Sequence, residues 1–237
     1  MIKLNSLPTT LLILATFLFV NTQVYASNDA VAAAKNALKK LDQIDSEQWS
    51  YKHIRRSAKE TTSSYFDPRR SDSQKWQLLL VNDQVPTIEE ISDFNEIWNH
   101  QTDVEQEVDE QGAGMSNMVD TNSLELDRTD DGIAYFNFVP RLDDMPEESD
   151  KLVGQLSVDM RSQHVISMSI KNKAPLTPAF SVQLDNFKMD FEFTLVDQKL
   201  VYKKIMMDMS GTAGFVKDIS EQTVEEFSEY YYVGPNS

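Results

Sequence analysis

The sequence predicts an α+β fold in which helices cover the concave face of a curved antiparallel sheet. Three observations support this prediction. Short segments of alternating apolar and polar residues follow one another closely through most of the chain. Helical patterns occur only in the N-terminal half and do not alternate with strands as βαβ units would. A change of phase inside the longest strand pattern indicates a bulge, which would bend the sheet.

Residues 1–26 have the layout of a cleavable secretory signal peptide. Lys3 gives a positive start, residues 11–20 form an apolar run, and Ala26 ends a small-residue cleavage site. The alternative is an uncleaved anchor, but the run has about half of the roughly 20 residues that a membrane-spanning helix needs. We expect export to the bacterial periplasm, a single domain over residues 27–237, and no stable membrane insertion after cleavage.

The composition restricts the chemistry and the partners of the chain. It contains no cysteine, which excludes disulfides, thiol catalysis, thiolate metal sites and a lipid anchor on cysteine. Its formal net charge of −16 opposes binding to nucleic acid and docking on anionic lipid headgroups through charge. No Asn-x-Ser/Thr sequon occurs, which favours a bacterial envelope over a eukaryotic secretory route.

The first expected helix covers residues 30–44, after a cap at Asn28-Asp29. We expect it to pack on the protein's own sheet, although a partner-binding helix would show the same pattern. Its apolar stripe consists of Val31, Ala34, Leu38 and Leu41.

Two strands and a second helix are expected next. The strands cover residues 49–56 and 75–81, with a turn at residues 66–71. Thr87 and Glu90 form a capping box at the start of the helix. The apolar stripe of this helix consists of Ile91, Phe94, Ile97 and Trp98. Residues 102–122 are acidic and Gly-containing, with no aromatic or basic residue, and we expect a mobile loop there.

The rest of the chain predicts strands separated by short turns. From 187 to 195 the odd positions are apolar, whereas from 180 to 184 the even positions are apolar. The switch near Asp185-Asn186 predicts the bulge. Turns are expected at 130–132 and 196–199. The expected strands cover residues 123–128, 133–139, 152–160, 165–171, 179–196, 199–209, 212–217 and 224–233.

No pattern for catalysis, metal binding or cofactor binding is found. The three histidines, at positions 53, 100 and 164, have no metal-ligand spacing. No nucleophile-elbow or phosphate-loop motif occurs, and the acidic clusters match no calcium motif. We therefore predict a protein that is not an enzyme and that has no catalytic residues, no metal ligands and no cofactor.

The apolar face of the curved sheet is the candidate binding surface. Flexible methionines and aromatic rings suit an acyl chain or an apolar peptide. The alternative is that the two helices fill this face and make it an ordinary core. The candidate lining residues are Phe180, Val182, Leu184, Phe187, Met189, Phe191, Phe193, Ile205 and Met207.

Several segments resemble an uncharacterised family of secreted bacterial proteins with a periplasmic lipoprotein-carrier-like (LolA-like) fold. They are residues 65–70, 76–79, 85–87, 214–219 and 227–230. The resemblance implies a half-barrel of about 8 to 11 antiparallel strands with a helical lid over an apolar cavity. It also implies an arginine inside the cavity that controls the lid. Arg55, Arg56 and Arg141 are the candidates for that arginine, and no single position matches.

The function expected from these observations is a soluble periplasmic binding or carrier protein. Its ligand would be lipid-like or an apolar peptide, held by burial in a cavity between sheet and helices. The alternative is an envelope scaffold for protein–protein interaction or stress sensing, whose partner is another envelope protein.

Overall fold

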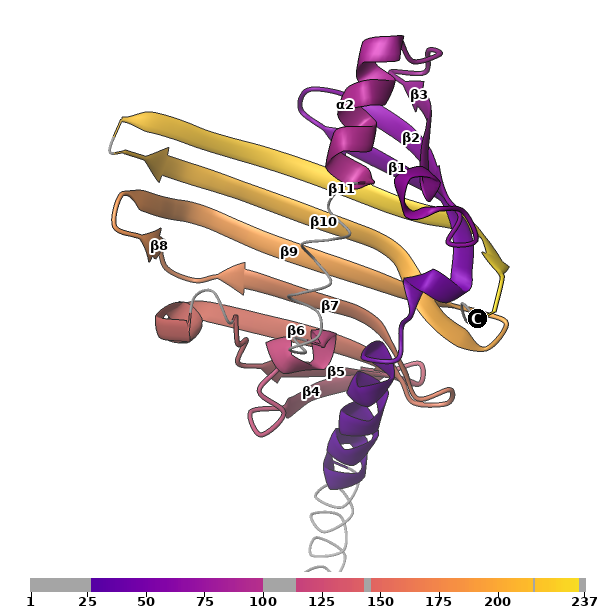
Figure 1. The fold of residues 1–237 in the computed structure, drawn as a ribbon. Helices are drawn as coiled ribbons and strands as arrows, with labels where there is room; N and C mark the ends of the chain where they lie inside the picture. Colours follow the sequence, from indigo (N-terminus) through magenta and orange to yellow (C-terminus); the bar gives the residue numbers. More distant parts are fainter. Residues whose placement is uncertain (1–26, 100–113, 143–145, 215, 235–237) are drawn as a thin grey trace, which may run out of the picture.

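The computed structural model describes residues 27–99, 114–142, 146–214 and 216–234. In these residues all strands belong to one open antiparallel sheet of 11 strands (Figure 1). The order across the sheet is β3-β2-β1-β11-β10-β9-β7-β6-β5-β4, and β8 pairs with β9. The strands are β1 (Trp49–Ser57), β2 (Thr61–Phe66), β3 (Trp76–Val81), β4 (Glu125–Asp130), β5 (Ile133–Phe138), β6 (Leu152–Asp159), β7 (His164–Asn172), β8 (Leu176–Ala179), β9 (Val182–Val196), β10 (Lys199–Ala213) and β11 (Lys217–Tyr232).

Helices are few, which confirms the α+β class. They are the helical run over residues 27–41, α2 (Ile88–Trp98), and the 3-10 turns η1 (Ser46–Gln48), η2 (Asp72–Gln74), η3 (Met115–Met118) and η4 (Pro146–Lys151). In the view of Figure 1, α2 lies in front of the sheet at the end formed by β1, β2 and β3, and the helical run lies at the opposite end, near β4 and β5, and extends beyond it. Within the described residues, no helix is both long enough and apolar enough to span a bilayer.

The bulge expected near Asp185-Asn186 is present in β9. Ser210 pairs with Asn186, and the next residue of β10, Gly211, pairs with Leu184, so that Asp185 is the extra residue. The apolar face therefore moves from even to odd positions at Asp185, as the sequence predicts. Gly211 is required here, because a Cβ would overlap the Gln183 carbonyl oxygen and lie 2.8 Å from the Leu184 Cα.

The expected turn at Val196–Lys199 is also confirmed. Asp197 and Gln198 have φ values of 49° and 64°, the left-handed conformation of a two-residue hairpin turn. The hairpin between β4 and β5 turns at Asp131 and Gly132, whose φ values are 45° and 80°.

Three strand predictions were wrong. β2 was missed because its residues are mostly Thr and Ser, and it is held by ladders to β1 and β3 instead of an apolar pattern. β8 was also missed. The strand expected at 212–217 is the end of β10 and the following turn, so β11 begins at Lys217 instead of residue 224.

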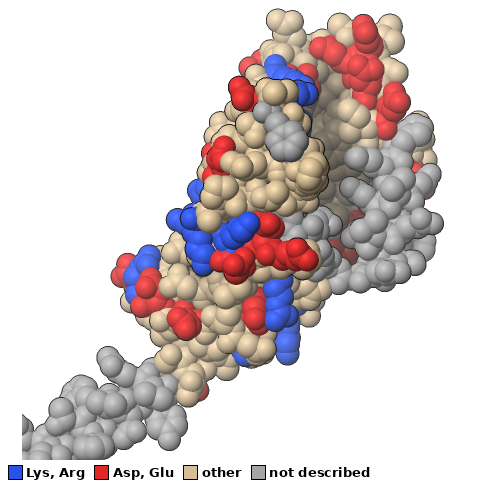
Figure 2. Space-filling model, turned by 90° about the vertical axis from the view of Figure 1, so that its left-hand side faces the viewer, with Lys and Arg blue, Asp and Glu red and all other residues tan. Residues whose placement is uncertain are grey.

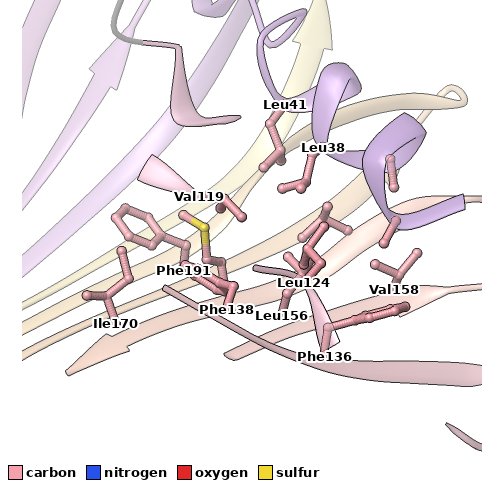
Figure 3. Close-up of a cluster of buried hydrophobic side chains, with 14 of the residues drawn as sticks. Leu38, Leu41, Val119, Leu124, Phe136, Phe138, Leu156, Val158, Ile170 and Phe191 are labelled. Carbon is pink, nitrogen blue, oxygen red and sulfur yellow. The ribbon is translucent and has the colours of Figure 1, made fainter. Parts of the chain in front are cut away.

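The main core lies between the helical run and strands β5, β6, β7 and β9. Ala34 and Ala37 are fully buried, and their small side chains allow the helix to approach the sheet closely. Leu38 and Leu41 point down toward Phe136 (Figure 3). The expected stripe therefore packs on the protein's own sheet, although the helix ends at residue 41 instead of 44.

Residues 114–122, the described part of the expected acidic loop, contact the main core. η3 places Met115 and Met118 against the main core, and Val119 is buried and pairs with Pro140. The Asp42 carboxylate accepts a hydrogen bond from the Ser116 amide at 3.0 Å. Three apolar side chains therefore attach this mostly polar segment to the core. Residues 102–113 and the expected signal peptide lie outside the described residues.

Candidate ligand-binding groove

The candidate lining residues from the sequence divide into three groups. Leu184, Phe187, Phe191 and Phe193 are buried in the main core. Val182, Met189 and Ile205 pack against that core, and Met207, opposite Met189 in the ladder, is half-buried.

Phe180 does not share this environment. Its exposed fraction is 92% because the chain turns between β8 and β9 and does not continue the alternation of β9. We therefore correct the expectation that Phe180 lines the same surface.

Two cavities of about 570 and 520 Å³ are bounded by other residues. None of the nine sequence candidates lines either of these two cavities. The smaller one, between α2 and the sheet, is called the α2 groove. It is lined by Arg55, Glu60, Thr62, Leu78, Val81, Glu90, Asp93, Phe94, Ile97, Trp98 and Glu225.

Both ends of α2 are fixed by side-chain hydrogen bonds. Thr87 Oγ1 accepts from the Glu90 amide, and the Glu90 carboxylate accepts from the Thr87 amide at 2.7 Å, which confirms the capping box. At the other end, Asn99 Oδ1 accepts from the Trp76 amide at 3.0 Å. Asn99 Nδ2 donates to the Trp76 carbonyl at 3.3 Å. Asn99 therefore anchors the helix to the outer side of edge strand β3.

The apolar face of α2 is wider than its contact with the sheet. Phe94 is buried, and the ring of Trp98 lies 4.9 Å from that of Trp76. Ile97, on one flank of this contact, is 55% exposed. On the other flank, Ile91 and Ile88 are 39% and 89% exposed. Such an amphipathic helix normally buries its whole apolar stripe, so α2 leaves apolar surface available beside the sheet.

A buried polar network lies at the floor of the α2 groove. His53 is 2% exposed, and its ring stacks on Phe227 at 4.9 Å. His53 Nε2 lies 3.2 Å from a carboxylate oxygen of Glu225, whose other oxygen lies 3.6 Å from Arg55 Nε. On the far side of the ring, His53 Nδ1 lies 3.3 Å from Ser64 Oγ. The carboxylate of Glu225 therefore joins the buried imidazole to the guanidinium that lines the groove.

The order Ser64–His53–Glu225 resembles the hydrogen-bond relay of serine hydrolases. A nucleophile must reach its substrate, however, and Ser64 is 1% exposed. The Ser64 hydroxyl also lies 3.5 Å from the His53 carbonyl, a contact that ties it to the strand. The network therefore gives no support for hydrolysis and holds β1, β2 and β11 together.

The larger cavity lies where the β6–β7 and β9–β10 hairpins approach the end of the helical run. Its two lysines are used within the protein. Lys40 Nζ donates to the Gln163 carbonyl at 2.7 Å. Lys199 Nζ donates to Gln48 at 3.0 Å and lies 3.8 Å above the Tyr232 ring. Neither lysine of this cavity is therefore left to pair with a ligand.

No group of three or more His, Asp or Glu side chains in the described part of the chain is arranged to hold a metal ion. The comparisons with known proteins give no relative: no family model, no curated protein and no solved structure matches this chain. The resemblance to lipoprotein carriers accordingly stays a prediction.

Proposed function

We propose that the protein is a non-catalytic periplasmic binding or carrier protein that holds a lipid-like molecule or an apolar peptide in the α2 groove. The observation that carries this proposal is the incomplete burial of the apolar face of α2 next to a groove of about 520 Å³. Ligand sites of proteins commonly have volumes of about 300–1,000 Å³.

Burial of apolar side chains would supply the binding energy. Full burial of a large aliphatic side chain is worth about 1.5–3 kcal/mol. Ile97 is about half exposed, so a ligand that covers it gains roughly 1 kcal/mol from this residue. Leu78, Val81, Phe94 and Trp98 add apolar walls on the remaining sides.

Arg55 is the best candidate for an arginine under the lid. It lines the α2 groove, whereas Arg56 and Arg141 do not; all three arginines form ion pairs, with Glu225, Glu226 and Asp120 respectively. In this proposal the curved sheet is a half-barrel and α2 is the lid over part of its concave face. The Arg55–Glu225 pair, formed between β1 and β11, lies on the floor of the groove under this lid.

The first test is native mass spectrometry of the purified protein, followed by titration with an apolar fluorescent dye. We expect Ile97→Ser to weaken dye binding severalfold. Ile88→Ser is the matched control, because it makes the same change on the same helix at a residue outside the groove. Equal effects of the two substitutions, or no binding at all, would contradict the proposal.

Export is tested by fractionation of the producing cells and N-terminal sequencing. The proposal requires recovery in the periplasm with a new N-terminus near Ser27. Recovery of the intact N-terminus in the cytoplasm would refute it.

The alternative function, an envelope interaction scaffold, is favoured by one observation. Phe180 and Val216 are 92% and 89% exposed at neighbouring hairpin ends, which are joined by the hydrogen bond from the Gly214 amide to the Ser181 carbonyl at 2.7 Å. A photo-crosslinker at position 180 should capture a defined envelope protein, and one at the exposed Tyr231 should not.

A further inference from the structure

We propose that the ligand of the α2 groove is a peptide segment in which Lys or Arg side chains accompany apolar ones. This inference rests on the proposed function: it favours a peptide over a lipid and adds cationic residues to the apolar ones. The inference follows from the charge of the groove and from the number of polar and charged residues that line it.

Acidic side chains outnumber basic ones in the lining of the groove. Its lining holds the carboxylates of Glu60, Glu90, Asp93 and Glu225 against the single guanidinium of Arg55. α2 itself carries four acidic residues and no basic one, and Figure 2 shows acidic side chains gathered where α2 lies. A cationic group is attracted to such a surface, whereas a lipid phosphate is repelled by it.

Two of the four carboxylates already have partners. Glu225 contacts His53 and Arg55, and Glu90 caps α2 through Thr87. In the described part of the chain neither Glu60 nor Asp93 forms an ion pair, and both are exposed at the rim. They are therefore the groups that a ligand cation would meet.

The lining also argues against an acyl chain. Six of its eleven residues are polar or charged, and an acyl chain would strip water from them without offering any hydrogen bond. A peptide brings backbone N–H donors and cationic side chains for these acceptors. Its apolar side chains would pack against Leu78, Ile97 and Trp98, in the way that amphipathic segments occupy grooves.

The inference is tested with three fluorescent ten-residue peptides that alternate Leu with Lys, Gln or Glu, measured by fluorescence anisotropy on the whole protein. We expect the Lys peptide to bind tightest and the Glu peptide weakest, with a difference that shrinks as salt is added. Each exposed ion pair contributes little free energy, so removing two of them should weaken binding of the Lys peptide by about two- to thirtyfold. The variant is Glu60→Gln with Asp93→Asn.

The matched control is Glu89→Gln with Glu96→Gln, which removes the same charge at residues of α2 outside the groove. We expect it to change the affinity by less than the rim variant does. If the Lys peptide binds no tighter than the Gln peptide, or if both double variants act alike, the inference is overturned. In that case, dye binding that Ile97→Ser still weakens would leave the proposed function standing. If the peptides show no preference and Ile97→Ser has no effect on dye binding, both the inference and the proposed function are refuted.

Discussion

Replacing Gly211 by alanine tests the geometry of the β9 bulge directly. The new Cβ would overlap the Gln183 carbonyl oxygen and lie 2.8 Å from the Leu184 Cα, against 3.4–4 Å for an ordinary contact. Both neighbours are backbone atoms, so the strands must separate by at least about half an ångström. Overpacking costs typically 1–3 kcal/mol, and more where the backbone moves. We expect the free energy of unfolding to fall by about 3 kcal/mol or more.

The loss is measured by urea denaturation, followed by circular dichroism. For a domain of this size, 3 kcal/mol corresponds to a decrease in Tm of roughly 6–12 °C. Gly132→Ala is the control, because Gly132 has φ +80° and a Cβ added there would meet no heavy atom within 4 Å. Its cost should come from backbone strain alone, about 1–2 kcal/mol. A Gly211→Ala variant that is no less stable than Gly132→Ala would refute the bulge geometry.

Three further predictions concern the core, the acid response and α2. Leu38→Ala should lower the free energy of unfolding by about 2–5 kcal/mol, against little change for the exposed Lys39→Ala, in the same denaturation assay. The hydrogen bond from Arg69 holds the pKa of Asp67 below its usual range. The ionised Asp67 carboxylate therefore stabilises the folded state above about pH 4, and this contribution is lost as the pH falls through the lowered pKa. Asp67→Asn should therefore flatten the loss of stability in acid. Thr87→Ala should raise amide exchange in the first turn of α2, since a lost cap costs about 1 kcal/mol.

Each of these predictions can fail in a specific way. Equal stability of Leu38→Ala and Lys39→Ala would mean that the helical run does not pack on the sheet through Leu38. If stability depends on pH in Asp67→Asn as it does in the unmodified protein, the Asp67–Arg69 pair does not contribute to the loss of stability in acid. Unchanged exchange in Thr87→Ala would show that the capping box does not hold the start of α2.

Features encoded by neighbouring residues were predictable from the sequence. The capping box at Thr87 and Glu90 and the phase change at Asp185 both follow from local patterns, because each depends on residues a few positions apart. β2 was missed because its stabilisation comes from ladders to two other strands. Its Thr and Ser residues give no apolar period to detect.

The candidate groove was predicted less well than the fold. The face marked by Phe187 and Phe191 was recognised as apolar, but in the structure these side chains are core. The α2 groove combines Arg55 and Leu78, from β1 and β3, with Glu225 from the distant strand β11, so no local pattern could reveal it. The one signal in the sequence was the width of the apolar face of α2, which includes three isoleucines that are only partly covered, at 39%, 55% and 89% exposure for Ile91, Ile97 and Ile88.

The pairing of β1 with β11 determines the order in which parts of the sheet can form. Arg56 and Glu226 are joined by a hydrogen bond, although they lie 170 positions apart in the chain. Closing such a large loop costs entropy before any contact compensates for it. During synthesis, the β1–β3 meander cannot complete its pairing with β11 until nearly the whole polypeptide has been made. Because Glu225 comes from the same late strand, the α2 groove is not complete before β11 has paired with β1.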